Sequence, residues 1–128
     1  MENIANDSVT LILPLKREYV STARLTASSI ANRIGFNIDE VEDIKVAVSE
    51  VCNIILSRET DESNQYRITF DIRERNLEIT FSGENAPFKC LKDSMDNEYG
   101  IYIMKALMDS VELCKENHSI VMTKKIGD

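Results

Sequence analysis

The sequence of 128 residues lacks a hydrophobic run near the ~20 residues that cross a bilayer, because its longest apolar stretches span only a few residues. It also lacks a signal sequence, since no charged segment, apolar core and small-residue cleavage site open the chain. Both absences favour a cytoplasmic protein. Basic residues are scarce too: 15 Lys and Arg stand against 22 Asp and Glu, a formal net charge of −7. Nucleic-acid binding usually needs a basic patch, so that class is disfavoured.

Cysteine and histidine are also few. The three cysteines, Cys52, Cys90 and Cys114, are far apart and form no C-x-x-C pair, and His118 is the only histidine. Zinc normally takes four clustered ligands, and an odd number of cysteines cannot pair completely within one chain. We therefore expect reduced, structural thiols, with a metal-binding or catalytic role as the alternative.

The composition that remains is that of a globular protein. Hydrophobic residues make up 43% of the chain and charged residues 29%, which argues against disorder. A chain of this length can bury a core without disulfide or metal cross-links. The sequence predicts a single domain over residues 1–128.

Two helices are predicted in the first half. Apolar residues at steps of three and four run from residue 17 to 34, and Gly35 follows as a helix stop. The second helix begins near Asn37, a good N-cap, with acids in its first turns that complement the helix dipole. Its expected core stripe is Ile38, Val41, Ile44, Val48, Val51, Cys52 and Ile55.

Strands are predicted where the apolar period changes to two. Residues 66–73 and 77–82 alternate in this way around a turn at 75–76, which indicates an antiparallel hairpin. The other expected elements are a strand at 9–13 that stops at Pro14, a helix at 100–108 after a long segment at 83–98, and strands at 111–115 and 119–124 around a turn at 117–118.

This order of elements predicts an α+β fold. Consecutive hairpin strands make the sheet mainly antiparallel, and three one-sided helices must cover one of its faces in a two-layer sandwich. Charge is unevenly placed, with eight acids and two bases in residues 37–62. That segment is either a solvated acidic face or a docking surface for a basic partner.

The second helix offers a candidate site. At ~100° per residue, Glu50 points away from the core stripe and shares a second face with Ala47 and Ile54. Asn53 lies ~60° from Glu50 and ~100° from Ile54 by the same geometry. An apolar Ile54 beside Glu50 indicates that this face is partly covered, and a covered carboxylate is a candidate general base. The alternative is that Glu50 is an ordinary surface acid.

A further candidate is the start of the third helix at Gly100. Free amides and the dipole at a helix N-terminus bind phosphate, and glycine lets the backbone come close. Asp96 and Glu98 put negative charge at the same place. The alternative is therefore that these acids cap the helix and repel an anion.

The two candidate segments resemble a known family. The stretches DIKVAVSEVC at residues 43–52 and GIYIMKALMD at residues 100–109 closely resemble the bacterial anti-sigma factor and serine-protein kinase family. The opening LILP at 11–14 and residues 19–36 are similar as well, so the resemblance spans nearly the whole chain. It implies the Bergerat ATP-binding fold, which the family shares with histidine kinases, gyrase and the Hsp90 chaperone (GHKL).

The resemblance implies roles for residues on the second helix. Family members carry Glu-x-x-x-Asn there, with Glu as general base and Asn as magnesium ligand. Glu50 matches the base, but the Asn position is Ile54, which offers no oxygen to a hard cation. Asn53 stands one residue early and is rotated away from the family position.

Two further family motifs are altered. The first is Asp-x-Gly-x-x-Phe, in which the Asp binds the adenine amino group. In this chain Phe88 matches the Phe, but Gly83 stands in the Asp position and Asn85 in the Gly position. Gly-x-Gly-Leu, the phosphate loop, keeps only Gly100, because Glu98 replaces the first glycine. Contacts to metal, base and phosphate are weakened together, which predicts that tight ATP binding is lost.

We therefore expect Glu50 at the catalytic position and Asn53, Asn85, Phe88 and Gly100 as cofactor-binding positions, with no metal ligand. The leading hypothesis is an anti-sigma-factor-like regulator that acts by protein binding, with a degenerate ATP pocket. Its partners by resemblance are a sigma factor and an anti-anti-sigma antagonist, and a homodimer is compatible with it. The alternatives are a working serine-protein kinase that uses ATP and magnesium, and a pocket remodelled for another small ligand.

Overall fold

A computed structural model describes residues 6–59, 61, 63–89, 99–113 and 115–127. Their five strands form one antiparallel sheet with the order β1-β2-β3-β5-β4. The strands are β1 (Ser8–Pro14), β2 (Gln65–Ile72), β3 (Asn76–Gly83), β4 (Ser110–Glu112) and β5 (Ile120–Lys125). The helices are α1 (Val20–Ile34), α2 (Ile38–Arg58) and α3 (Tyr99–Leu107), with short 3₁₀ turns at Arg17–Tyr19 and Glu116–His118.

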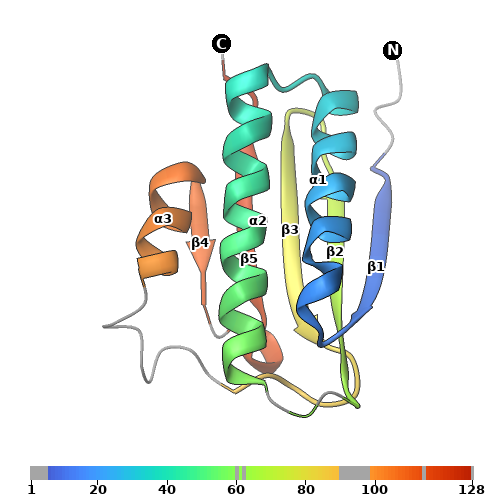
Figure 1. The fold of residues 1–128 in the computed structure, drawn as a ribbon. Coiled ribbons are helices and arrows are strands. Elements are labelled where there is room, and N and C mark those ends of the chain that lie inside the picture. The colour runs from blue at the N-terminus through green and yellow to red at the C-terminus, as the bar shows by residue number, and fades with distance from the viewer. Residues whose placement is uncertain (1–5, 60, 62, 90–98, 114, 128) are drawn as a thin grey trace.

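The helices lie on one face of the sheet (Figure 1). α1 packs beside α2 above the sheet, and α3 lies at the outer edge, where it contacts α2 and β4. The opposite face of the sheet carries no helix in the described part of the chain, which confirms the expected two-layer α+β sandwich. None of the described helices is long and apolar enough to cross a membrane.

The ends of the first two helices form as their sequence predicts. Gly35 closes α1 in the left-handed conformation, with φ of 112°. Asn37 caps α2 by accepting a hydrogen bond from the Glu40 amide, while the Glu40 carboxylate accepts one from the Asn37 amide. This reciprocal capping box satisfies two amides that a helix start otherwise leaves free.

The predicted core stripe of α2 is wrong at Ile38 and confirmed at its other residues. Ile38 is 80% exposed because, six residues before Ile44, it points about 120° away from the buried side at ~100° per residue. Ala47 and Ile54 are buried in addition to the expected residues. α2 is covered on a second side because α3 packs against it.

Other element boundaries differ by a few residues. The first expected helix begins with a separate 3₁₀ turn, and Pro14 is included in β1 as its last residue. The final strands are confirmed with shorter or shifted bounds, around a turn where Asn117 and His118 adopt φ of 57° and 61°. The expected structural thiol is confirmed at Cys52, which is free and buried, whereas Cys90 and Cys114 lie outside the described residues.

Cys52 gives the fold a pH dependence. Burial raises the pKa of its thiol to about 11, above the ~8.5 of a thiol in an unfolded chain. Above pH 8.5 the unfolded state therefore loses a proton that the folded state keeps, so stability falls as pH rises. We expect the free energy of unfolding to drop by about 2 kcal/mol between pH 8 and pH 10.5 because of this group.

Urea unfolding at those two pH values measures the drop. Cys52→Ala is the matched control, since it removes the thiol. Its stability will differ from the wild type at both pH values, but its fall with pH should be smaller by about 2 kcal/mol. Equal falls in the two proteins would show that Cys52 titrates normally.

Candidate functional site

The structure brings three of the singled-out residues together where α3 meets α2. Glu50 and Ile54 lie one turn apart on α2, and Gly100 is the second residue of α3. A Cβ atom placed on Gly100 would lie 2.8 Å from Glu50 Oε1 and 3.1 Å from Ile54 Cδ1. Only a glycine at this position lets the two helices approach so closely without displacing these side chains.

Ile54 packs against Gly100 in this contact. Its side chain is only 4% exposed and belongs to the hydrophobic core, while Glu50 is half-buried beside it. The prediction that Ile54 marks a covered face is confirmed. The carboxylate of Glu50 thus lies against the first turn of α3, the place where helix amides and the dipole favour a negative charge.

The other expected site residues lie elsewhere. Asn53 is exposed on α2, away from the buried Ile54. Phe88 is 5% exposed and part of the hydrophobic core, and Lys89 after it donates its amide to Glu59 at the end of α2. Asp96 and Glu98, the acids expected to cap the third helix, lie outside the described residues.

The segment after β3 is folded back on itself. A Cβ atom on Gly83 would overlap the carbonyl oxygen of Ala86, so the backbone occupies the space that a side chain at position 83 would need. The Asn85 Oδ1 accepts a hydrogen bond from the Gln65 amide at 2.9 Å. Gly83 and Asn85 line a hollow of about 380 Å³ that includes neither Glu50 nor Gly100.

Glu84 points to the open face of the sheet, as the alternation of a strand predicts. Its carboxylate accepts two hydrogen bonds from the Arg67 guanidinium, at 2.8 and 3.1 Å. The bond to Arg67 lowers the pKa of Glu84. Glu84 is therefore engaged in an ion pair on the face opposite the helices and does not replace an acid at position 83.

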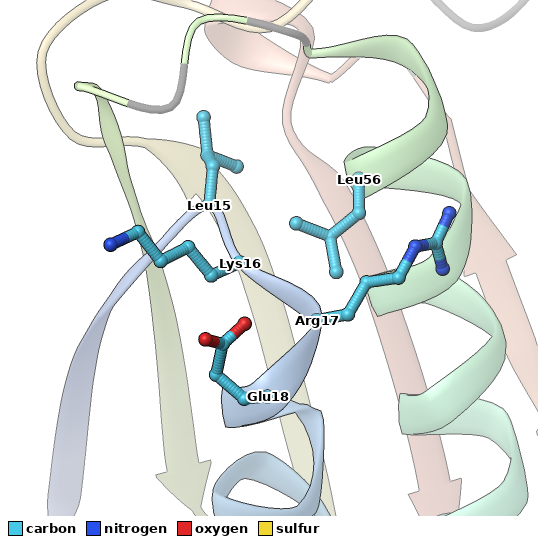
Figure 2. Close-up of a pocket in the computed structure, with 5 residues that line it drawn as sticks. All are labelled: Leu15, Lys16, Arg17, Glu18 and Leu56. Atoms are coloured by element: carbon cyan, nitrogen blue, oxygen red, sulfur yellow. The ribbon is translucent and has the colours of Figure 1, made fainter.

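A separate groove of about 410 Å³ lies where β1 leads into α1 (Figure 2). Leu15 and Leu56 line it together with the charged side chains of Lys16, Arg17 and Glu18. None of the expected site residues is among these five. The groove is thus distinct from the contact between Glu50 and Gly100.

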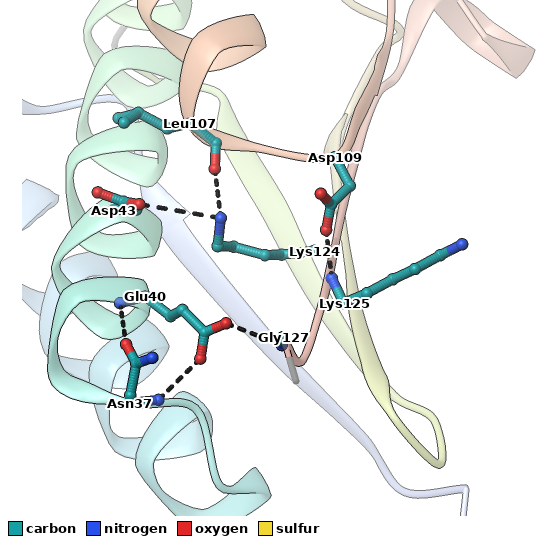
Figure 3. Close-up of polar contacts among 8 residues, drawn as sticks. All are labelled: Asn37, Glu40, Asp43, Leu107, Asp109, Lys124, Lys125 and Gly127. Carbon is teal, nitrogen blue, oxygen red and sulfur yellow. Dashed lines mark hydrogen bonds and ion pairs between the residues drawn. The ribbon is translucent and has the colours of Figure 1, made fainter.

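Lys124 is a residue that the sequence analysis missed. Its ammonium group donates to the carbonyl oxygen of Leu107 at 2.6 Å and lies 3.9 Å from Asp43 (Figure 3). Its side chain is only 12% exposed. A cation at the last carbonyl of a helix is favourable, so Lys124 holds the C-terminal end of α3 against α2 and β5. The signal was its place in β5, where it alternates onto the same face as Ile120 and Met122.

Replacing Lys124 by methionine should loosen α3. The variant keeps the apolar stem but removes the hydrogen bond to Leu107 and the ion pair with Asp43, at a cost of about 1–2 kcal/mol. Hydrogen exchange of the amides in residues 99–107 should become about tenfold faster. Lys125→Met is the matched control, because the Lys125 side chain points away from this cluster in Figure 3 and only its backbone amide binds Asp109. Equal exchange in both variants would show that Lys124 does not anchor α3.

The chain is similar to known proteins over most of its length. The sequence pattern of the histidine kinase-like ATPase domain family matches residues 13–124. The chain belongs to this family. The resemblance to its anti-sigma factor and serine-protein kinase branch is confirmed by relatives that are about 30% identical over most of the chain.

Two such relatives carry the name serine-protein kinase RsbW. The protein from Halalkalibacterium halodurans is 30% identical over 131 residues, which cover 91% of this chain and 80% of that protein. One from Bacillus cereus is 32% identical over 137 residues, which cover 94% of this chain and 86% of that protein. The crystal structure of the RsbU and RsbW domains of Rv1364c from Mycobacterium tuberculosis has the same fold. It matches with a TM-score of 0.67 and 12% identity over 94% of this chain and 32% of that chain.

The family implies ATP, usually with magnesium, and the geometry at Glu50 tests the fit. Magnesium takes oxygen ligands in near-octahedral geometry, and Ile54 presents a buried hydrocarbon where the family places an amide. Gly83 likewise has no carboxylate, and the Ala86 carbonyl fills the space for one. The residues present therefore do not fit a tightly held magnesium–ATP complex.

Proposed function

We propose that this chain is an anti-sigma-factor-like regulator that acts by binding proteins and has weak or no kinase activity. The observation that supports this most directly is the packing of Ile54 against Gly100 beside the Glu50 carboxylate. Hydrocarbon fills the place where the family carries its metal ligand. This feature opposes binding of a metal–nucleotide complex, because magnesium needs oxygen ligands.

The proposed partners are a sigma factor and an anti-anti-sigma antagonist. They follow from the family and from the resemblance of residues 43–52 and 100–109 to its anti-sigma members. The net charge of −7 is compatible with a basic protein partner, because complementary charge speeds association and fixes register. A homodimer is a further part of the proposal, and nucleic acid and membrane are not among its partners.

A second candidate function is an active serine-protein kinase. The contact of Glu50 with the start of α3 favours it, because a candidate base and a candidate phosphate-binding helix end lie side by side. The relatives named serine-protein kinase favour it as well. Asn53 would then have to turn toward Glu50 to supply the missing oxygen, although it is exposed in this structure.

Binding and phosphate transfer measured side by side distinguish the two functions. Each sigma factor and each anti-anti-sigma protein of the same genome is titrated with the full chain, with and without magnesium–ATP. We expect at least one to bind with a Kd that nucleotide changes by less than twofold, and no labelled phosphate on any antagonist. Glu50→Gln, the matched variant, should bind equally well. Phosphate transfer that this variant abolishes would instead establish the kinase.

A further inference from the structure

The two edges of the sheet differ in length and in charge. β4, at one edge, has three residues, and its Glu112 is exposed and acidic. β1, at the other edge, runs over Ser8–Pro14 and has no charged residue (Figure 1). Proteins normally keep an edge strand short, charged or covered, because its unpaired backbone groups can bind another strand. β1 is neither short nor charged, so its edge is open to a further strand.

The backbone of β1 bonds alternately to β2 and toward the free edge. Just before the strand, Asp7 accepts a hydrogen bond from the Ile72 amide at 2.8 Å. Just after it, Leu15 donates its amide to Asn64 at 3.3 Å. In an antiparallel ladder the bonded positions recur at every second residue, so the odd-numbered residues between these two also bond to β2. The even-numbered residues then point their amides and carbonyls to the free edge: Ser8, Thr10 and Ile12.

Pro14 and two exposed side chains agree with this arrangement. Pro14 is even-numbered, so the amide hydrogen that proline lacks is one that β2 does not use. Val9 is 38% exposed and shares the helix-covered face of the sheet with the buried Leu13, while Ile12 is 42% exposed on the open face. A strand added at this edge would therefore cover apolar surface on both faces.

We propose that β1 binds β1 of a second copy of this chain, antiparallel, with Thr10 opposite Thr10 of the second copy. A two-fold axis places a strand beside itself in the opposite direction, which gives a closed dimer. In this register Ser8 opposes Ile12 on both sides of the axis. The three opposed pairs make about six hydrogen bonds between the copies, two for each pair.

The second copy is the occupant because β1 is complementary to itself. All the outward amides and carbonyls between Ser8 and Ile12 find partners in an identical strand, and Val9 opposes Leu11 on the helix-covered face. A register that opposes Pro14 to Ser8 would instead leave the Ser8 carbonyl without a donor. The inference rests on the homodimer of the proposed function and assigns its interface.

Sedimentation velocity of the full chain tests the interface. We expect the wild type to be dimeric at about 100 μM chain. Thr10→Lys places two ammonium groups opposite each other at the axis, where like charges repel, and should raise the dimer Kd at least tenfold. Thr80→Lys is the matched control, because Thr80 lies on the same face two strands away from this edge. Its dimer Kd should stay within twofold of wild type.

Thr10→Pro tests the backbone contribution. It removes the amide that points to the free edge and leaves the bonds between β1 and β2 in place. The variant should be monomeric at the same concentration, and its circular dichroism spectrum should match that of the wild type. The same spectrum checks that the lysine variants are folded.

Mixing Thr10→Lys with Thr10→Glu tests the register. Each variant alone should be monomeric, whereas the equimolar mixture should form a heterodimer that weakens as salt is raised. The lysine of one copy meets the glutamate of the other only if position 10 opposes position 10. Monomeric variants that form no heterodimer when mixed would overturn the register centred on Thr10.

The remaining outcomes separate the inference from the proposed function. A dimer that both Thr10→Lys and Thr10→Pro leave intact would overturn the β1 interface while the homodimer stands. A wild type that stays monomeric would overturn the interface and the homodimer together. The titrations with sigma factors and antagonists test the rest of the proposed function independently of either result.

Discussion

Replacing Ile54 by asparagine is expected to destabilise the protein by about 3 kcal/mol, although it restores the amide that the family uses as a magnesium ligand. The isoleucine is 4% exposed and contributes to the core at the junction of α2 with α3. Asparagine loses that apolar burial and places an amide against Gly100, where the structure shows hydrocarbon packing. Urea unfolding followed by circular dichroism measures the change.

Two neighbouring variants serve as controls for this result. Ile54→Val keeps the apolar contact with one methylene fewer and should cost about 1 kcal/mol. Asn53→Ala changes an exposed side chain and should stay within about 0.5 kcal/mol of wild type. An Ile54→Asn variant as stable as wild type would mean that position 54 faces an open, hydrated site, and the packing described for it would be wrong.

The second large effect is expected at Gly83. Gly83→Asp restores the acid that the family uses for adenine, but its Cβ would overlap the Ala86 carbonyl oxygen. Backbone atoms cannot move aside as the tip of a side chain can, so the segment after β3 has to shift. We expect a loss of about 2–3 kcal/mol of stability and no gain in ATP affinity.

Gly83→Ala separates the overlap from the charge, because it adds only the Cβ atom. It should cost nearly as much as Gly83→Asp. Gly127→Ala is the control, since a Cβ there would lie 3.1 Å from the flexible Glu40 carboxylate near the chain end, and should cost less than about 0.5 kcal/mol. If Gly83→Ala is equally harmless in urea unfolding, the segment is pliable and the adenine-binding position is open.

Much of the fold could be predicted from local rules. Asn37 with Glu40 marks the start of α2, Gly35 marks the end of α1, and the change of apolar period marks the β2–β3 hairpin. Each of these signals comes from residues close in sequence. The strand order of the sheet was not predicted, because it depends on pairing between strands far apart in the chain. Ile38 was wrongly included in the core stripe because it stands three residues before Val41, although it points about 120° away from the direction of Ile44.

The candidate site was predictable only in part. Helix geometry placed Glu50 and Ile54 on one face of the helix. The apolar character of Ile54 indicated that this face is partly covered by another part of the chain. Helix geometry could not show that Gly100 packs directly against Glu50 and Ile54, because this contact joins residues far apart in the chain. The blocked space at Gly83 depends on the path of the following backbone, and no single residue type signals it.

Isothermal calorimetry of the wild-type chain with ATP and ADP, each with and without magnesium, tests the central claim most directly. Ile54 stands in the position of the magnesium ligand, and the Ala86 carbonyl fills the space of the acid that would bind adenine. We therefore expect no detectable heat of binding up to high micromolar nucleotide, and no effect of magnesium. Micromolar affinity that depends on magnesium would contradict the account, because it would require an oxygen ligand and an open cleft beside Glu50 and Gly100.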